Sequence, residues 1–162
     1  MSLSKEMQSR INKINSLTKQ DFSISVFNYW VKIRDPHGND INWRSQGNEK
    51  LPGLSPIALI LGPFVATQIR DWKYFELQFY WLFLTRILCE IFLSGYNINS
   101  ILYISFVYFI WYYSQLYPFK RYKSENNFKE ISPILSIPIG LMLMLLIHGF
   151  LFLIFGTFYF DN

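Results

Sequence analysis

Two long stretches without a charged side chain constrain this chain more than any other feature of its sequence. One runs from Ile91 to Phe119 and the other from Ile131 to Phe160. A helix needs roughly 20 apolar residues to cross about 30 Å of hydrocarbon, whereas a helix on the surface of a water-soluble domain carries polar residues along one face. A chain of 162 residues with two such stretches is therefore expected to lie largely in a lipid bilayer.

Charge is distributed unevenly along the chain. The first 53 residues carry eight Lys/Arg and five Asp/Glu, whereas the 109 residues after them carry only seven and six. The hydrophobic content of 51% is also high for a water-soluble domain of this size. These patterns predict a basic extramembrane region over residues 1–53 and a membrane domain over residues 54–162.

The first twenty residues carry isolated apolar side chains at helical spacing: Leu3, Met7, Ile11, Ile14 and Leu17. This pattern predicts an amphipathic helix, with its apolar face on a membrane surface or against a partner. The segment lacks the continuous apolar core of a secretory signal peptide. We therefore expect it to be retained.

A short hairpin is predicted next. Apolar and polar residues alternate from Phe27 to Arg34, which is the two-residue period of a strand. Turn-forming residues occupy 35–39, and the chain is expected to return through Asp40 to Trp43. His37 lies in this turn, where no zinc or calcium spacing is met, so a solvated side chain is expected there.

Four apolar segments follow. Residues 54–67 would reach only about 21 Å as a helix and contain Gly62-Pro63, so this segment is too short to span comfortably. The proposed spans are residues 77–94, 98–116 and 139–160. The predicted fold is an all-α integral membrane protein with three transmembrane helices and one short interfacial or re-entrant segment, preceded by the polar region with its amphipathic helix.

The loops predict the orientation of these spans. Lys and Arg occur in the N-terminal region, between residues 68 and 76, and between residues 117 and 130, whereas the turn at residues 95–97 has none. If residues 54–67 do not cross, all three basic regions share one side of the membrane, which suits the positive-inside rule. We expect a multi-pass protein of a bacterial cytoplasmic membrane or a mitochondrial inner membrane, with its N-terminus on the cytoplasmic or matrix side. Four spans are the alternative.

Arg86 and Glu90 are the charged residues inside a predicted span. They stand four residues apart, so they lie on one helical face and can form an ion pair. Gln78, Thr85 and Cys89 fall in the adjacent sector, which makes a polar stripe expected to face protein or water. Such residues mark either a path for ions or protons or a pair that fixes helix packing, and we favour packing over the path.

The last predicted span carries three further candidate residues. His148 lies near its middle, where a neutral imidazole can bond to the Arg86/Glu90 stripe. A haem held by two histidines of this chain is not expected, because His37 lies in the polar N-terminal region. Gly149 and Gly156 are seven residues apart, a spacing that opens one helix face to close approach by a neighbour.

The sequence carries no recognisable catalytic or cofactor-binding motif and no nucleic-acid-binding motif. We therefore expect a non-catalytic protein without a cofactor, whose partners are the lipid bilayer and either other membrane subunits or further copies of itself. The leading hypothesis is an accessory subunit or assembly factor of a larger inner-membrane complex. The alternatives are a small oligomeric transporter or channel for protons or a small ion, and a membrane-resident immunity or defence protein.

Overall fold

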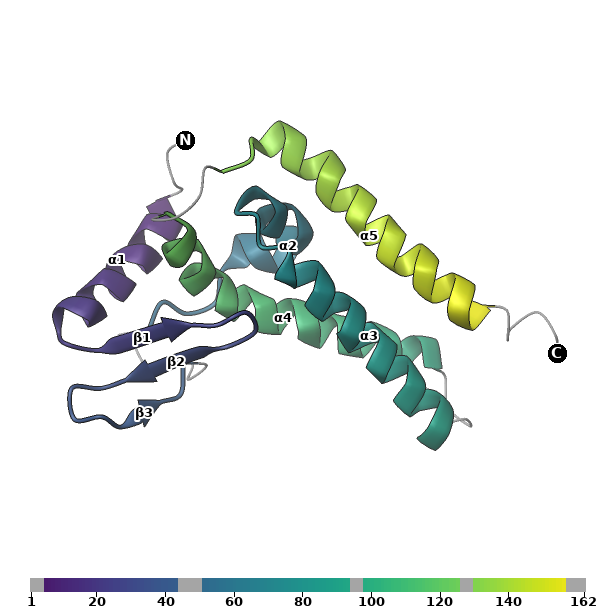
Figure 1. Ribbon diagram of the computed structural model, residues 1–162, viewed down its shortest axis with the longest axis horizontal. Helices are drawn as coiled ribbons and strands as arrows, with labels where there is room; N and C mark the ends of the chain where they lie inside the picture. The colour runs from purple at the N-terminus through teal and green to yellow at the C-terminus, as the bar shows by residue number, and fades with distance from the viewer. Residues whose placement is uncertain (1–4, 44–50, 94–97, 126–129, 157–162) are drawn as a thin grey trace.

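The computed structural model describes residues 5–43, 51–93, 98–125 and 130–156. Within these residues the chain forms five helices and a small sheet. Their bounds are α1 Lys5–Lys19, β1 Ser23–Val26, β2 Val31–Arg34, β3 Asp40–Ile41, α2 Pro56–Gln68, α3 Lys73–Phe92, α4 Ile98–Glu125 and α5 Pro133–Phe155. The molecule is elongated, with α1 and the sheet at one end and the last turns of α3 and α5 at the other (Figure 1).

The three strands form an antiparallel sheet in the order β1-β2-β3. Its turn between β2 and β3 follows the sequence prediction, because the Asp35 carboxylate accepts hydrogen bonds from the backbone N–H groups of His37 and Asn39, and Gly38 takes a φ of 86°. The strand predicted to begin at Phe27 is shorter than expected and begins at Val31. Strand β1 was not predicted, so the fold is mostly helical with a small sheet and not all-α.

Helix α1 is amphipathic, as predicted, but its apolar face is already covered by the chain itself. Met7, Ile11, Ile14 and Leu17 are all buried in one core with residues of the sheet and of α4. Leu3 lies outside the described residues. This face is therefore used in folding and is not left for a membrane surface or a partner.

Helix α2 corresponds to the segment predicted to be interfacial or re-entrant. It has a kink at Leu61, where φ is −118° and ψ is 30°, two residues before Pro63. Proline removes a backbone N–H and its ring crowds the preceding turn, so the kink has a direct cause in the sequence. Helix α2 packs against both α4 and α5.

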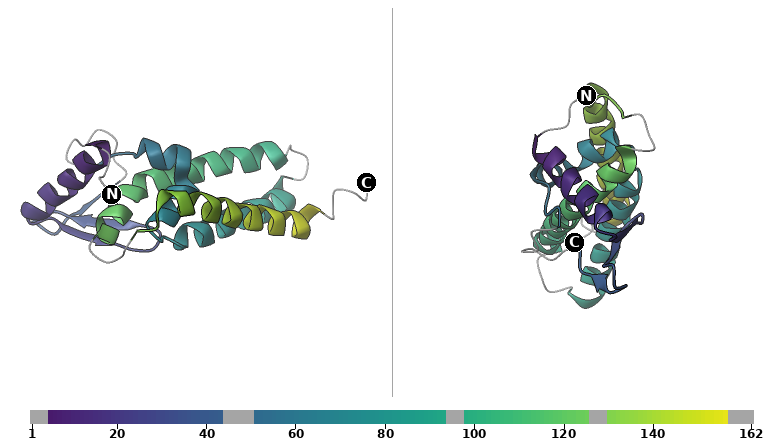
Figure 2. Two further views of the ribbon diagram at one scale, coloured as in Figure 1. Left: turned by 90° about the horizontal axis from the view of Figure 1, so that it is seen from above. Right: turned by 90° about the vertical axis from the view of Figure 1, so that its left-hand side faces the viewer.

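Helices α3 and α4 lie side by side in opposite directions. Trp81 of α3 donates a hydrogen bond from Nε1 to the Ser105 hydroxyl of α4 at 2.8 Å, and Tyr74 lies against Tyr113 with ring centroids 4.5 Å apart. The left view in Figure 2 shows α4 extending back toward α1 and the sheet. The start of α3 and the end of α4 therefore lie at the same end of the molecule.

Helix α5 begins earlier than the predicted span 139–160, at Pro133. Ser132 caps it by accepting a hydrogen bond from the Leu135 N–H, and proline is favourable at the first helical position because its missing N–H would have no intrahelical partner. The helix packs against α2 and α3. Residues 157–160 of the predicted span lie outside the described residues.

Among the helices that the structure describes, α5 alone is both long and apolar enough to cross a membrane. Only 6% of its most apolar 18-residue window is buried within the chain. Helix α2 is apolar but has 13 residues. Helix α3 carries charged residues in both halves, and α4 is rich in tyrosine and has polar residues at both ends, which lowers their mean hydropathy.

Candidate functional site

The pairing of Arg86 with Glu90, predicted from their spacing, is confirmed. Arg86 Nε donates to Glu90 Oε1 at 2.9 Å across one turn of α3. The arginine side chain is 8% exposed and the glutamate side chain 36% exposed, so the pair reaches from the helix packing out to the surface. The Arg86 guanidinium also lies 5.4 Å from the centre of the Phe155 ring of α5, a cation–π contact.

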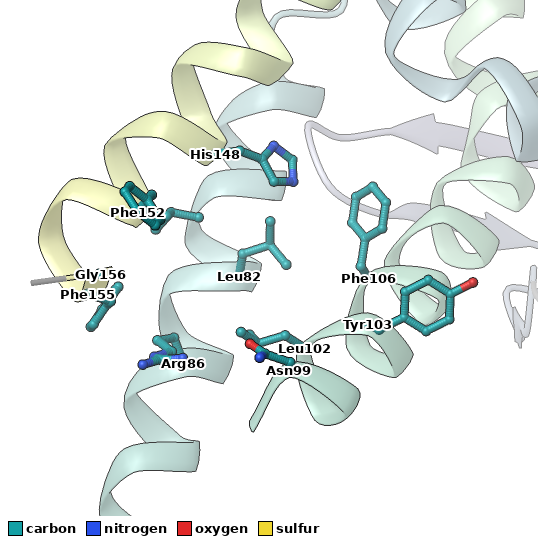
Figure 3. Close-up of a pocket in the computed structure, with 11 residues that line it drawn as sticks. Leu82, Arg86, Asn99, Leu102, Tyr103, Phe106, His148, Phe152, Phe155 and Gly156 are labelled. Atoms are coloured by element: carbon teal, nitrogen blue, oxygen red, sulfur yellow. The ribbon is translucent and has the colours of Figure 1, made fainter. Parts of the chain in front are cut away.

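A cavity of about 490 Å³ lies between α3, α4 and α5, and the Arg86 side chain lines it. Figure 3 shows side chains from all three helices directed around this space. Its lining is largely apolar, with Arg86, Asn99, Tyr103 and His148 as the polar members. Asn99 and Arg86 lie toward one end of the cavity, and His148 lies toward the other (Figure 3).

His148 lines the same cavity as Arg86, but it does not bond to the Arg86/Glu90 pair as predicted. Its Nδ1 lies 2.9 Å from the backbone carbonyl oxygen of Met144, one turn earlier on α5. The imidazole also meets the Phe106 ring edge-on, with centroids 6.0 Å apart. The position of His148 thus supports the prediction that it shares one site with Arg86, although no hydrogen bond joins these two side chains.

Gly149 and Gly156 differ in their surroundings. A Cβ added at Gly149 would meet no described atom within 4 Å, so this position is open. A Cβ at Gly156 would lie 3.1 Å from the Phe152 ring of the same helix. The predicted face for close approach therefore exists at Gly149, whereas Gly156 ends α5 and is covered by Phe152.

Gly140, which was not among the predicted packing glycines, is the glycine that brings α5 and α2 together. A Cβ at Gly140 of α5 would lie 3.1 Å from the backbone oxygen of Pro63 and 3.2 Å from Thr67 Oγ1, both in α2. Ser136 and Gly140 are four residues apart and both buried. Small residues at this spacing allow close helix packing, so the signal was present in the sequence.

Helix α2 carries the matching pattern. Ala58, Gly62 and Ala66 recur every four residues and are all buried. The hydroxyl of Tyr74 occupies the space beside Gly62, where an added Cβ would lie 3.1 Å from that oxygen. The segment predicted to be interfacial is therefore a packed element that joins α4 and α5.

The polar stripe of α3 faces protein, as predicted, and continues further than the sequence analysis traced it. Gln78 is fully buried, and neither atom of its side-chain amide has a hydrogen-bond partner among the described residues. Tyr74, one turn earlier, is 1% exposed, and its hydroxyl is likewise unpartnered in the described chain. Thr85 differs from both, because its hydroxyl bonds with Ser105 of α4 at 2.9 Å.

A second charged cluster lies where α3 begins. The sequence indicated its lysine only as part of the basic region at residues 117–130. Lys120 of α4 pairs with Asp71 at 3.1 Å, and Tyr113 donates to the other oxygen of Asp71 at 3.1 Å. Burial lowers the pKa of Lys120, and the neighbouring Asp71 opposes that shift. The partly buried pair joins α4 to the turn between α2 and α3.

The arrangement is suited to holding helices together and to solvating polar groups, and it offers no assembled ligand set for a metal. Within residues 5–43, 51–93, 98–125 and 130–156, no group of three or more His, Cys, Asp or Glu side chains lies close enough to bind an ion. Cys89 is buried and forms no disulfide there. No family model, curated protein or solved structure matches this chain.

Proposed function

We propose that this chain is a three-span membrane protein that acts without catalysis, by association with other membrane proteins as an accessory subunit or assembly factor. The observation that carries the proposal is the exposure of α5, which presents a broad apolar surface around the open position Gly149. The proposed spans are the apolar parts of α3, α4 and α5, and the basic C-terminal end of α4 lies outside the membrane.

The distribution of charge supports three spans. Contacts tie the basic regions together at the end of the molecule that holds the sheet: Tyr29 donates to Glu76 at 2.8 Å, and Lys123 donates to the backbone oxygen of Val26 at 3.0 Å. Toward the other end, α3 and α4 expose Leu88, Phe92 and Ile104. An apolar surface of this kind suits lipid, and the clustered basic residues suit one membrane face.

The apolar surface of α5 has the features that a second membrane helix needs. Leu145, Leu146 and Leu153 are exposed on the turns that flank Gly149. Lipid chains are as apolar as leucine, so helices associate in a bilayer through close packing at small residues and not through the hydrophobic effect. A glycine that the chain itself leaves open, among exposed leucines, is such a contact point for a partner helix.

The test is the variant Gly149→Leu in the native membrane. A Cβ added at this position meets no described atom within 4 Å, so we expect the fold to be retained while a partner helix can no longer approach. Extraction in mild detergent, a native gel and mass spectrometry of the comigrating chains measure the association. We expect the wild-type chain to migrate in a complex with other membrane proteins and Gly149→Leu to be released from it.

Ile137→Phe is the control for added bulk. Ile137 is exposed on the same helix, 12 residues before Gly149 and therefore about 18 Å away along the axis. This variant is expected to remain in the complex. A wild-type chain that migrates as a monomer, or a Gly149→Leu chain that stays in the complex, contradicts the proposal.

A further inference from the structure

We propose that the buried face of α3 carries a water-filled polar path, and that protons cross the membrane along it. The juxtaposition that suggests it is a line of polar side chains, Tyr74, Gln78, Arg86 and Glu90, beside the cavity that Arg86 shares with His148. The inference goes beyond association, and it rests on the proposed function in one respect: α3 must cross the bilayer.

The spacing of these residues makes each of them a neighbour of the next, in a line that winds about 160° around the helix from Tyr74 to Glu90. Tyr74, Gln78, Leu82, Arg86 and Glu90 follow one another every four residues, and side chains four apart are neighbours on a helix surface. Four of the five are polar. The line runs along most of α3, from its second residue to within two residues of its last.

The middle of the line holds polar atoms that require water. Both amide atoms of Gln78 and the hydroxyl of Tyr74 are buried and have no partner among the described residues. An unsatisfied buried donor or acceptor costs about 1–3 kcal/mol, so native proteins rarely leave one without a protein group or a bound water. Two such side chains one turn apart indicate an internal hydrated site and not an apolar packing face.

Leu82 interrupts the polar line, and the cavity lies against this interruption. Leu82 and Arg86 both line the cavity. The ring contacts Phe79–Phe150 and Phe83–Phe155, at 5.8 and 5.7 Å, show that α3 and α5 run in the same direction, which places His148 near the depth of Gln78. The volume of about 490 Å³ has room for several waters, and Asn99, Tyr103, Arg86 and His148 are the polar groups of the lining that could bond to them.

Both ends of the line lie beside charged groups, and at one end the side chains of Asp71 and Lys120 are 9% and 10% exposed. At one end Tyr74 lies against Tyr113, whose hydroxyl bonds to Asp71 of the Asp71–Lys120 pair. At the other end the Glu90 carboxylate is partly exposed. A proton taken up at one end passes between waters, hydroxyl and imidazole groups and leaves at the other, with no net chemical change and with the pH gradient as the driving force.

The experiment measures proton flux in liposomes that contain the purified chain and an internal pH-sensitive dye, with valinomycin and potassium to prevent a build-up of charge. The wild-type protein is expected to dissipate a pH gradient faster than protein-free liposomes do. Gln78→Leu is expected to lose this protein-dependent flux. Tyr74→Phe is expected to lose most of it, because it removes only the hydroxyl and keeps the ring contacts with Phe109 and Tyr113.

Gln115→Leu is the matched control. Gln115 of α4 is also a buried glutamine whose amide is unpartnered in the described chain. It stands three residues after Tyr112 and four before Phe119, the two residues whose rings meet Trp43, so it belongs to the side of α4 that faces the N-terminal region. Gln115→Leu is expected to keep the wild-type flux.

Resistance to alkaline carbonate extraction distinguishes the two proposals. Inserted wild-type protein without flux, or flux that persists in Tyr74→Phe and Gln78→Leu, overturns the path and leaves the three spans standing. Protein that carbonate strips from the liposomes overturns the three spans and the path together. If Gln78→Leu does not insert, Tyr74→Phe decides the result.

Discussion

Gly140 is the residue at which the backbone of α5 lies against α2. Its surroundings explain why an added side chain would crowd α2 here, whereas Gly149, nine residues later on the same helix, has open space. The two glycines look alike in the sequence, because both lie in a long apolar stretch. What separates them is the partner helix, which only the folded chain supplies.

Gly140→Ala is therefore expected to destabilise the protein, by about 1–3 kcal/mol as for other overpacked positions. The new Cβ would meet the Phe64 ring at 3.0 Å and the fixed backbone oxygen of Pro63 at 3.1 Å. Gly149→Ala is expected to leave the stability unchanged or raise it slightly, since alanine is the better helix former. Thermal unfolding of both variants in mild detergent measures the difference, and equal midpoints would contradict this assignment of the packing glycine.

At the residue scale the sequence predicted the Arg86–Glu90 pair, because an i, i+4 spacing on a helix determines the neighbour. It did not predict the hydrogen bond of His148 to the Met144 backbone, since an imidazole on a helix can turn to its own preceding turn or to another helix. The Asp71–Lys120 contact was also beyond the sequence, because it joins residues 49 positions apart.

At the scale of elements, α1 is an amphipathic helix that is held by tertiary contacts. Its four buried residues were all recognised from their spacing, whereas the surface that covers them was not, because periodicity gives the direction of a face and not its partner. The start of α5 was placed six residues late for a related reason. Pro133 lies directly after the N-cap Ser132, and proline at the first helical position favours helix initiation.

Ile14→Ala tests whether α1 is part of the folded core. Ile14 is fully buried, and removing its side chain is expected to cost about 2–5 kcal/mol. Limited proteolysis of the protein in detergent should then release the N-terminal region more rapidly. Gln8→Ala, on the exposed side of α1, is the control and should behave as wild type. If Ile14→Ala is as resistant as wild type, α1 is held elsewhere.

At the scale of the whole molecule, the chain has a charged end and an apolar end. The sheet, α1 and the basic ends of α3 and α4 lie together, and the longer apolar segments extend away from them (Figure 1). This polarity follows from the uneven distribution of charge in the sequence. The number of spans does not follow in the same way, because tyrosine and charged residues lower the mean hydropathy of α3 and α4 even where their surfaces are apolar.

The most direct test of the three-span arrangement is the labelling of single cysteines by a membrane-impermeant maleimide in sealed native vesicles. Cys89 is buried and is first replaced by serine. Asn39→Cys in the turn of the sheet and Lys123→Cys near the end of α4 should be labelled from the same side, and Leu93→Cys, just after α3, from the opposite side only. Labelling of Leu93→Cys from the side of Asn39→Cys would contradict the account.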